Sequence, residues 1–159
     1  MNIKNTITFL FAAVVLVLAG SIETNAQSAK MKSLMGEIKD TFPKYEKIIT
    51  DNCDGAKVKY EVDFASFGDD YDALLRVPSM GLNESSYGIQ RFCYYTNDNI
   101  GKDAVKSKIK TVRLKNITDK GGKKITLLKD GTLLLEMAFH YYDAGLSNVE
   151  VQRILGDIL

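Results

Sequence analysis

The chain has 159 residues, of which 45% are hydrophobic and 26% charged, and its 21 basic residues nearly balance its 20 acidic ones. This composition excludes collagen-like and low-complexity chains, and the hydrophobic content argues against intrinsic disorder. A length near 150 residues is typical of one domain with a substantial core.

The first 26 residues have the pattern of a secretory signal peptide. Lys4 gives a short positive start, Ile7–Leu18 is almost wholly apolar, and small residues lead to Ala26. The apolar run is shorter than the roughly 20 residues that span a bilayer, and an uncleaved anchor is the alternative interpretation. We therefore predict an exported protein, periplasmic or extracellular, whose mature part (residues 27–159) is a single domain without an integral membrane span.

The chain has two cysteines, Cys53 and Cys93. Only one intramolecular pairing exists, and disulfides persist in the compartments that exported proteins reach. We predict a Cys53–Cys93 disulfide, with two inert free thiols as the alternative. Two distant cysteines and the single histidine, His140, do not form a metal-ligand set, and no Cys-x-x-Cys pair points to thiol–disulfide catalysis.

The mature part begins with a predicted helix. Apolar residues recur every three or four positions from Met31 to Ile48, which indicates one buried helix face. Pro43 lies inside this pattern and predicts a kink or a break. Apolar and charged residues then alternate over Lys57–Phe64, the pattern of a strand with one buried face.

Two more strands are predicted in the middle of the chain. Ala73–Val77 is a short apolar run closed by Pro78, and Tyr87–Thr96 is rich in aromatic residues. The segment between them, Ser79–Ser86, has the Ser, Gly and Asn content of a loop. Short strands joined by such loops favour an antiparallel meander.

A second helix is predicted over Lys102–Lys115. Val105, Ile109 and Val112 have helical spacing, although Val112 and Leu114 also fit a strand. Gly121 and its neighbouring glycine end this segment.

The last part of the chain predicts a hairpin and a closing helix. The strands Lys123–Lys129 and Thr132–Tyr142 flank Asp130-Gly131, a dipeptide suited to a type I′ turn. Ser147 and Glu150 then match a capping box that starts the final helix. The elements give an α+β fold, an antiparallel sheet of about five strands with helices packed on it, in the order α-β-β-β-α-β-β-α.

The carboxy-terminal third also resembles a known family. The segments LLKDGTLLLEMAF and AGLSNVEVQRIL, within Lys123–Leu155, resemble the bacterial YbjN-like family, whose domains are similar in fold to type III secretion chaperones. The matching positions are Asn116, Lys123-Lys124, Asp130-Gly131, Leu135-Glu136 and Leu146-Ser147. The resemblance implies helices packed on an antiparallel sheet, no enzymatic activity, and a domain that dimerises or holds a protein partner.

Apolar residues on both faces of the predicted hairpin suggest a partner surface. We expect Ile125, Leu127 and Leu134 to line the sheet face that the first and last helices leave open, because an uncovered apolar patch marks a partner or dimer interface. The alternative is that the second helix covers them.

Positive charge is concentrated in one segment. Gly101–Lys129 contains ten basic residues against two acidic ones, a net charge of +8. This stripe is a candidate for binding anionic ligands or the anionic envelope surface, and a solvated face paired with acidic neighbours is the alternative. Export and the lack of interleaved aromatic residues disfavour nucleic acid. The candidate anion-binding residues are Lys106, Lys108, Lys110, Arg113 and Lys115.

Catalytic motifs are missing from the sequence. There is one histidine, no Gly-x-Ser-x-Gly nucleophile motif and no Gly-rich phosphate loop. The acidic turn Asp69–Asp72 does not have the spacing of an EF-hand calcium loop. We therefore expect a non-catalytic, cofactor-free and metal-free exported protein that binds a polypeptide in a chaperone-like way, with an envelope-surface binder as the alternative.

Overall fold

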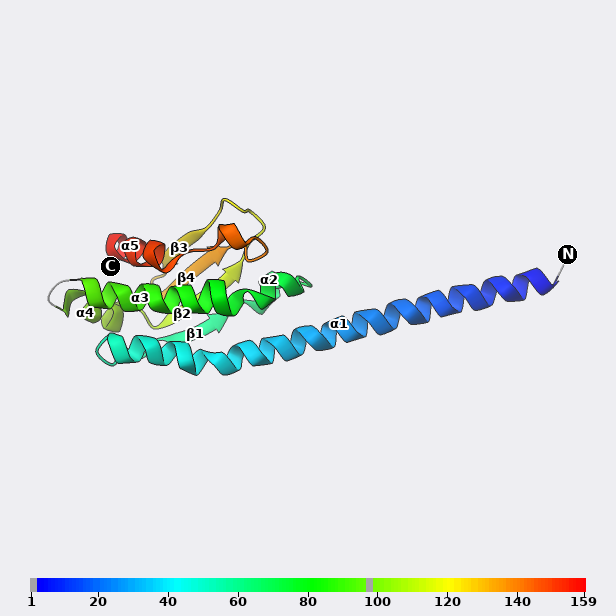
Figure 1. The fold of residues 1–159 in the computed structure, drawn as a ribbon, viewed down its shortest axis with the longest axis horizontal. Coiled ribbons are helices and arrows are strands. Elements are labelled where there is room, and N and C mark those ends of the chain that lie inside the picture. Colours follow the sequence, from blue (N-terminus) through cyan, green and yellow to red (C-terminus); the bar gives the residue numbers. More distant parts are fainter. Residues whose placement is uncertain (1–2, 97–98) are drawn as a thin grey trace.

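The computed structural model describes the backbone of residues 3–96 and 99–159, and the side chains of residues 28–96 and 99–159. The predicted signal segment, residues 1–26, lies outside the residues whose side chains are described. The fold is α+β, as expected, and a long first helix leads into a body of helices and one sheet (Figure 1). In chain order the elements are α1 Ile3–Asn52, β1 Lys59–Val62, η1 Phe64–Phe67, α2 Tyr71–Leu75, η2 Val77–Asn83, α3 Glu84–Tyr95, α4 Ile100–Lys108, β2 Thr111–Asn116, β3 Lys124–Leu127, β4 Thr132–Met137, η4 Tyr142–Ala144 and α5 Asn148–Ile158.

The sheet has four strands in the order β1-β2-β4-β3. β1 and β4 both run parallel to β2, and only β3 is antiparallel to its neighbour β4. The predicted antiparallel sheet of about five strands is therefore wrong in detail, as is the predicted element order. The reason is that two predicted strands are helices, which supply the crossover that a parallel β1–β2 pair requires.

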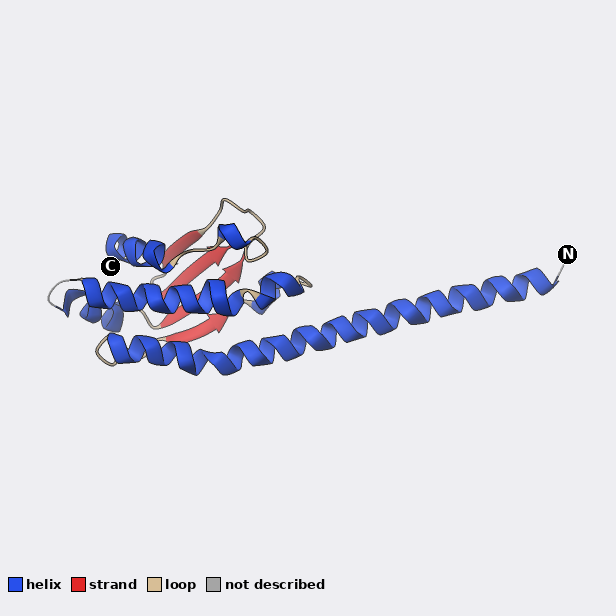
Figure 2. Cartoon of the chain, viewed as in Figure 1, coloured by secondary structure: helices blue, strands red, loops and turns tan. Residues whose placement is uncertain are grey.

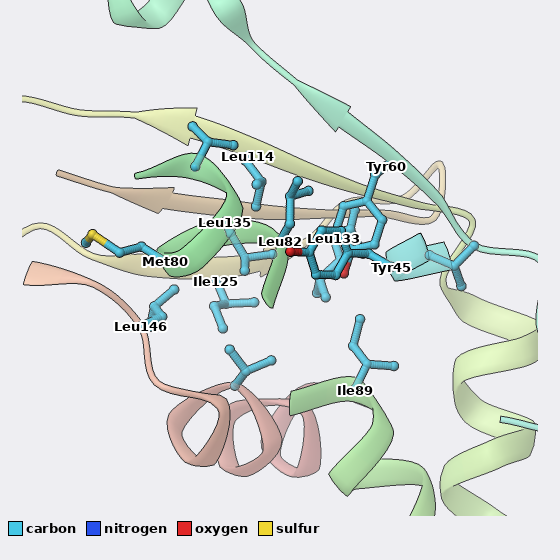
Figure 3. Packing of buried hydrophobic residues seen from close by; sticks show 14 of the residues in the cluster. Tyr45, Tyr60, Met80, Leu82, Ile89, Leu114, Ile125, Leu133, Leu135 and Leu146 are labelled. Carbon is cyan, nitrogen blue, oxygen red and sulfur yellow. The ribbon is translucent and has the colours of Figure 1, made fainter. Parts of the chain in front are cut away.

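Helices cover one face of this sheet. α3, α5 and the second half of α1 lie across it (Figure 2). The strands turn Val112, Leu114, Leu133 and Leu135 toward these helices, and all four are fully buried. Figure 3 shows the sheet residues packed with Ile89 of α3. This is the main hydrophobic core.

The predicted first helix is confirmed as the second half of α1. Met31, Leu34, Ile38 and Tyr45 are buried at the predicted helical spacing. Pro43 lies inside the helix, and the ribbon bends in this part of α1 (Figure 1). A proline removes one intrahelical hydrogen bond and crowds the preceding turn, which accounts for a bend without a break.

The predicted strand Ala73–Val77 is wrong, because residues Tyr71–Leu75 form α2. The Asp70 side chain caps this helix by accepting a hydrogen bond from the backbone N–H of Ala73 at 2.9 Å. Ala and Leu favour helix, and a short apolar run does not distinguish a buried helix from a strand.

The predicted strand Tyr87–Thr96 is also wrong, because Glu84–Tyr95 is helix α3. The predicted loop before it is wrong too, since η2 occupies Val77–Asn83. The buried residues Ser85, Ile89 and Phe92 follow helical spacing. The aromatic residues here favoured a strand by propensity, which tertiary packing overrides.

The predicted helix Lys102–Lys115 is confirmed only in its first half. α4 ends at Lys108, and β2 begins at Thr111 with Val112 and Leu114 buried in alternation. Alternating burial next to β-branched residues is the signature of a strand that has one covered face.

The carboxy-terminal hairpin and helix are confirmed, but the predicted strand Thr132–Tyr142 is too long, because β4 ends at Met137 and the chain then turns into η4. The hairpin does not use a type I′ turn, however, because Gly131 has a positive φ of 89° and Asp130 does not have a positive φ. The N–H of Gly131 donates to Leu128 O and the N–H of Leu128 donates to Thr132 O, which is a type I turn followed by a glycine bulge. Ser147 and Glu150 form the predicted capping box at the start of α5.

Candidate functional site

The predicted disulfide joins the end of α1 to α3. Cys53 and Cys93 are bonded, with a Cα–Cα distance of 5.5 Å, and both are buried. The described residues contain no free cysteine. The bond holds α1 and α3 together on the covered face of the sheet.

The three predicted partner-binding residues do not share one surface. Ile125 and Leu127 pair with Leu135 and Leu133 across the β3–β4 ladder, so they lie on the covered face. Leu134 lies on the opposite face, in register with Arg113 and Thr126. Ile125 is buried in the core, while Leu127 and Leu134 are partly exposed. The expectation that all three line one open face is wrong, because a one-residue step along a strand reverses the side chain's direction.

Most of the predicted anion-binding residues have carboxylate or carbonyl partners. Lys106 lies 2.9 Å from Asp54, Arg113 lies 2.7 Å from Glu61, and Lys115 lies 2.9 Å from Glu136. The Lys106 ammonium lowers the pKa of Asp54 through a hydrogen bond. Lys108 donates to the backbone oxygen of Leu159. Among the described residues, Lys108 and Lys110 of the predicted set have no acidic side-chain partner within 4 Å, and Lys110 also lacks the carbonyl partner that Lys108 has.

His140 belongs to a structural network at the end of β4. Its Nδ1 lies 2.9 Å from Asp70 Oδ2, and the other Asp70 oxygen caps α2. Arg76 donates to the carbonyl of Phe139 at 3.2 Å and also to that of His140. The side chains described contain no cluster of three His, Cys, Asp or Glu residues able to hold a metal ion.

Tyr60 and Ser85 form a buried polar pair with a structural role. Tyr60 Oη lies 2.9 Å from Ser85 Oγ, and both side chains are buried. Burial raises the pKa of Tyr60 strongly, because an ionised phenolate would lose its hydration. Ser85 in turn donates to the Gly81 carbonyl at 2.6 Å, so this pair satisfies its own hydrogen bonds inside the core.

The clearest candidate binding surface lies between α3 and α5. Tyr87, Arg91, Tyr94 and Tyr95 occupy the outward face of α3 and, with Gln90 and Asn148, line a hollow of about 370 Å³. We call this set the tyrosine groove. Tyr94 and Tyr95 are 75% and 60% exposed, and Tyr87 is 40% exposed. Large aromatic side chains gathered on a surface are unusual and mark interaction sites.

The groove has fixed walls. The Tyr94 and Tyr95 rings meet edge to face with centroids 5.0 Å apart, and the Arg91 guanidinium lies 5.2 Å from the Tyr95 ring centroid. Arg91 Nε donates to Gln152 of α5 at 3.0 Å. Gln90 donates to Asn52 of α1 at 3.1 Å, which ties the groove floor to the first helix.

Close packing brings the two helices of the groove together. A Cβ on Gly88 would lie only 2.5 Å from Val151 Cβ, so α3 and α5 are closer at this point than any other residue allows. Asn148, the first residue of α5, donates through its backbone N–H and its side chain to Glu84 at 2.6 and 3.0 Å. The groove is therefore held at both helices.

Sequence reasoning missed this surface because it placed Tyr87–Thr96 on a strand. The signal was present: Tyr87, Arg91 and Tyr94 follow four- and three-residue steps, while Ser85, Ile89 and Phe92 follow the same steps on the buried side. Two interleaved helical stripes, one aromatic and polar and one apolar, indicate a helix with a distinctive exposed face.

The chain matches no protein-family model, no curated protein and no solved structure. Among residues 28–96 and 99–159, whose side chains are described, no helix combines the length and the apolar character needed to cross a membrane.

Proposed function

We propose that this protein is a non-catalytic, exported polypeptide-binding domain whose docking surface is the tyrosine groove. The observation that carries this proposal is a single hollow between α3 and α5 that is lined by three exposed tyrosines and one half-buried arginine. Tyr and Arg are the residue types that dominate the binding energy of protein interfaces. The resemblance to YbjN-like proteins, which implies a non-enzymatic polypeptide binder, agrees with it.

The groove chemistry indicates what kind of segment it takes. The tyrosine rings offer flat apolar contact area, and their hydroxyl groups accept or donate hydrogen bonds at the rim. Among the described residues, the Nη atoms of Arg91 make no hydrogen bond, and a guanidinium binds a carboxylate through two parallel bonds. We expect a segment with an apolar or aromatic anchor next to a carboxylate.

Export is the second part of the proposal. The signal-like first 26 residues support it, and the buried Cys53–Cys93 disulfide is compatible with an oxidising compartment. The anionic-surface alternative has less support, because Lys106, Arg113 and Lys115 are each paired with a carboxylate.

Selection of short peptides from a displayed random library tests the proposal. Peptides selected on the purified wild-type protein are synthesised, and their Kd values are measured by fluorescence polarisation against wild type and Y94S/Y95S. We expect at least a tenfold weaker Kd for the double variant, since both rings are exposed and their loss leaves the core intact. Y141S is the matched control, because Tyr141 is an exposed tyrosine outside the groove.

Two results would overturn the proposal. One is a set of selected peptides that binds wild type and Y94S/Y95S equally well. The other is a selection on wild type that enriches no peptide beyond those enriched on Y94S/Y95S. R91Q should weaken only the peptides that carry a carboxylate beside their anchor.

A further inference from the structure

The strand β3 forms an open edge of the sheet. It is the outermost strand, next to β4 alone (Figure 2). The Leu128 N–H donates to Thr132 O at 2.8 Å, and antiparallel ladder bonds alternate, so Thr126 and Lys124 also face β4. The backbone N–H and C=O groups of Ile125 and Leu127 therefore point outward from the edge of the sheet, away from β4. Among the described residues they have no hydrogen-bond partner.

The opposite edge of the sheet is strand β1, and one of its outward backbone donors is already hydrogen-bonded to α1. The N–H of Tyr60 in β1 donates to Glu46 Oε1 of α1 at 3.1 Å. The other oxygen of Glu46 lies 2.8 Å from Lys59 Nζ. The Glu46 carboxylate thus already accepts the Tyr60 N–H, which an added strand would need as a hydrogen-bond donor. No side chain of the described residues accepts the outward N–H groups of β3 in this way.

Lysines without acidic partners lie at both ends of β3. A hollow of about 440 Å³ lies beside its carboxyl end, lined by Lys110 and Lys129 together with Leu127 and Leu128. Within the described part of the chain, Lys110, Lys124 and Lys129 have no carboxylate within 4 Å. Asp130 also lines the hollow, but its Oδ1 accepts the Thr132 N–H at 2.9 Å, and this bond lowers its pKa.

We infer that β3 binds an extended acidic polypeptide segment by strand addition, with Lys110 and Lys129 contacting its carboxylates. The unpaired peptide groups of Ile125 and Leu127 supply the ladder hydrogen bonds, as in other cases where a peptide extends an exposed sheet edge. The lysines select for acidic side chains, and the partly exposed Leu128 contacts an apolar one. A second copy of β3 is a poor occupant, because antiparallel pairing brings the lysines of the two strands together, and like charges opposite one another destabilise a ladder.

Amide hydrogen exchange provides the most direct test. The probe is a seven-residue blocked peptide of alternating Glu and Val, with a Lys–Val peptide of the same length as its counterpart. When the purified protein is saturated with the Glu–Val peptide, exchange at the Ile125 and Leu127 amides should slow at least tenfold. The Thr126 amide already faces β4 and should change little.

The role of charge is tested by removing it. K110Q/K129Q should weaken Glu–Val binding at least tenfold at low salt, and binding to wild type should weaken as salt is raised. K30Q/K32Q is the matched control, because it removes two exposed lysines from α1, far along the chain from β3. L127P should abolish slow exchange at Ile125 while L127V retains it, since proline removes an outward-pointing donor.

Three results would overturn the inference. Lysine-dependent binding without slower exchange at Ile125 and Leu127 would exclude strand addition. Equal binding of the Glu–Val and Lys–Val peptides would exclude selection of acidic segments. Slow exchange that depends on protein concentration and needs no peptide would identify a second copy as the occupant. Because Y94S/Y95S leaves β3 unchanged, it should bind the Glu–Val peptide as wild type does, which separates this inference from the tyrosine groove.

Discussion

Removing the Cys53–Cys93 bond should cost a large part of the stability of this domain. The bond closes a loop with a sequence separation of 40 residues. In the chain-entropy model, constraining such a loop lowers the entropy of the unfolded chain by about 13 cal/mol/K, which is about 4 kcal/mol at 25 °C. Both sulfur atoms are buried between α1 and α3, so replacing them also removes some packing. For a domain of this size, the loss corresponds to a decrease in Tm of roughly 15 °C.

Urea unfolding followed by circular dichroism measures this loss. C53A/C93A should unfold with a free energy about 4 kcal/mol lower than that of the oxidised wild type, and its m value should not fall, since its unfolded chain is less constrained. Wild type treated with a thiol reductant is the control and should approach the stability of the double variant. A loss below about 1 kcal/mol would refute the reasoning, because the loop-closure term alone exceeds that value.

Two further predictions concern α5. G88A should destabilise the protein by about 1–3 kcal/mol, the usual cost of overpacking, because its Cβ would clash with Val151, whereas G156A, with open space around it, should be neutral or stabilising in the same urea assay. The hydrogen bond from Lys123 lowers the pKa of Glu150 from 4.5 to about 2, so the stability that ionised Glu150 contributes is present above pH 4.5 and is lost as the pH falls toward 2. E150Q should flatten this part of a plot of unfolding free energy against pH, and an unchanged acid limb would show that the Lys123–Glu150 contact does not stabilise the fold.

The sequence predicted those elements whose local signals agree with their packing. The carboxy-terminal hairpin combines a Gly131 turn with alternating Leu133 and Leu135, and the final helix has a complete capping box. Each signal there is short-range and points to the same structure. The disulfide was predictable for a different reason, since two cysteines allow only one intramolecular pairing.

The parallel sheet could not be predicted from local pattern. Strand direction depends on what the chain does between β1 and β2, and that segment was misread. In Ala73–Leu75 the apolar run fits either state, and in Tyr87–Tyr95 the aromatic residues favour strands by propensity. The Asp70 cap on α2 and the helical spacing of Ile89 and Phe92 were the signals that decide against strands.

For the candidate site too, local features could be predicted from the sequence and long-range ones could not. The three predicted partner-binding residues were placed on the correct strands, but the predicted surface combined Ile125 and Leu127 with Leu134, which lies on the other face. The sequence shows the excess of positive charge in residues 101–129. It does not show which of these lysines have acidic partners in the fold and which do not. Glu61 lies 52 residues from Arg113 in the chain, and no local pattern reveals such a pair.

The arrangement of covalent and packing constraints around α3 supports its proposed role as a recognition element. The disulfide fixes α3 to α1 through Cys93, and the close contact at Gly88 fixes it to α5. Tyr94 and Tyr95 immediately follow Cys93, so the two most exposed rings of the groove stand next to the disulfide. Tyrosine has few rotatable bonds, and a surface whose backbone is already ordered loses little further entropy on binding. A scaffold built only for stability has no need to keep three tyrosines in water, whereas a binding surface gains affinity from holding them in place.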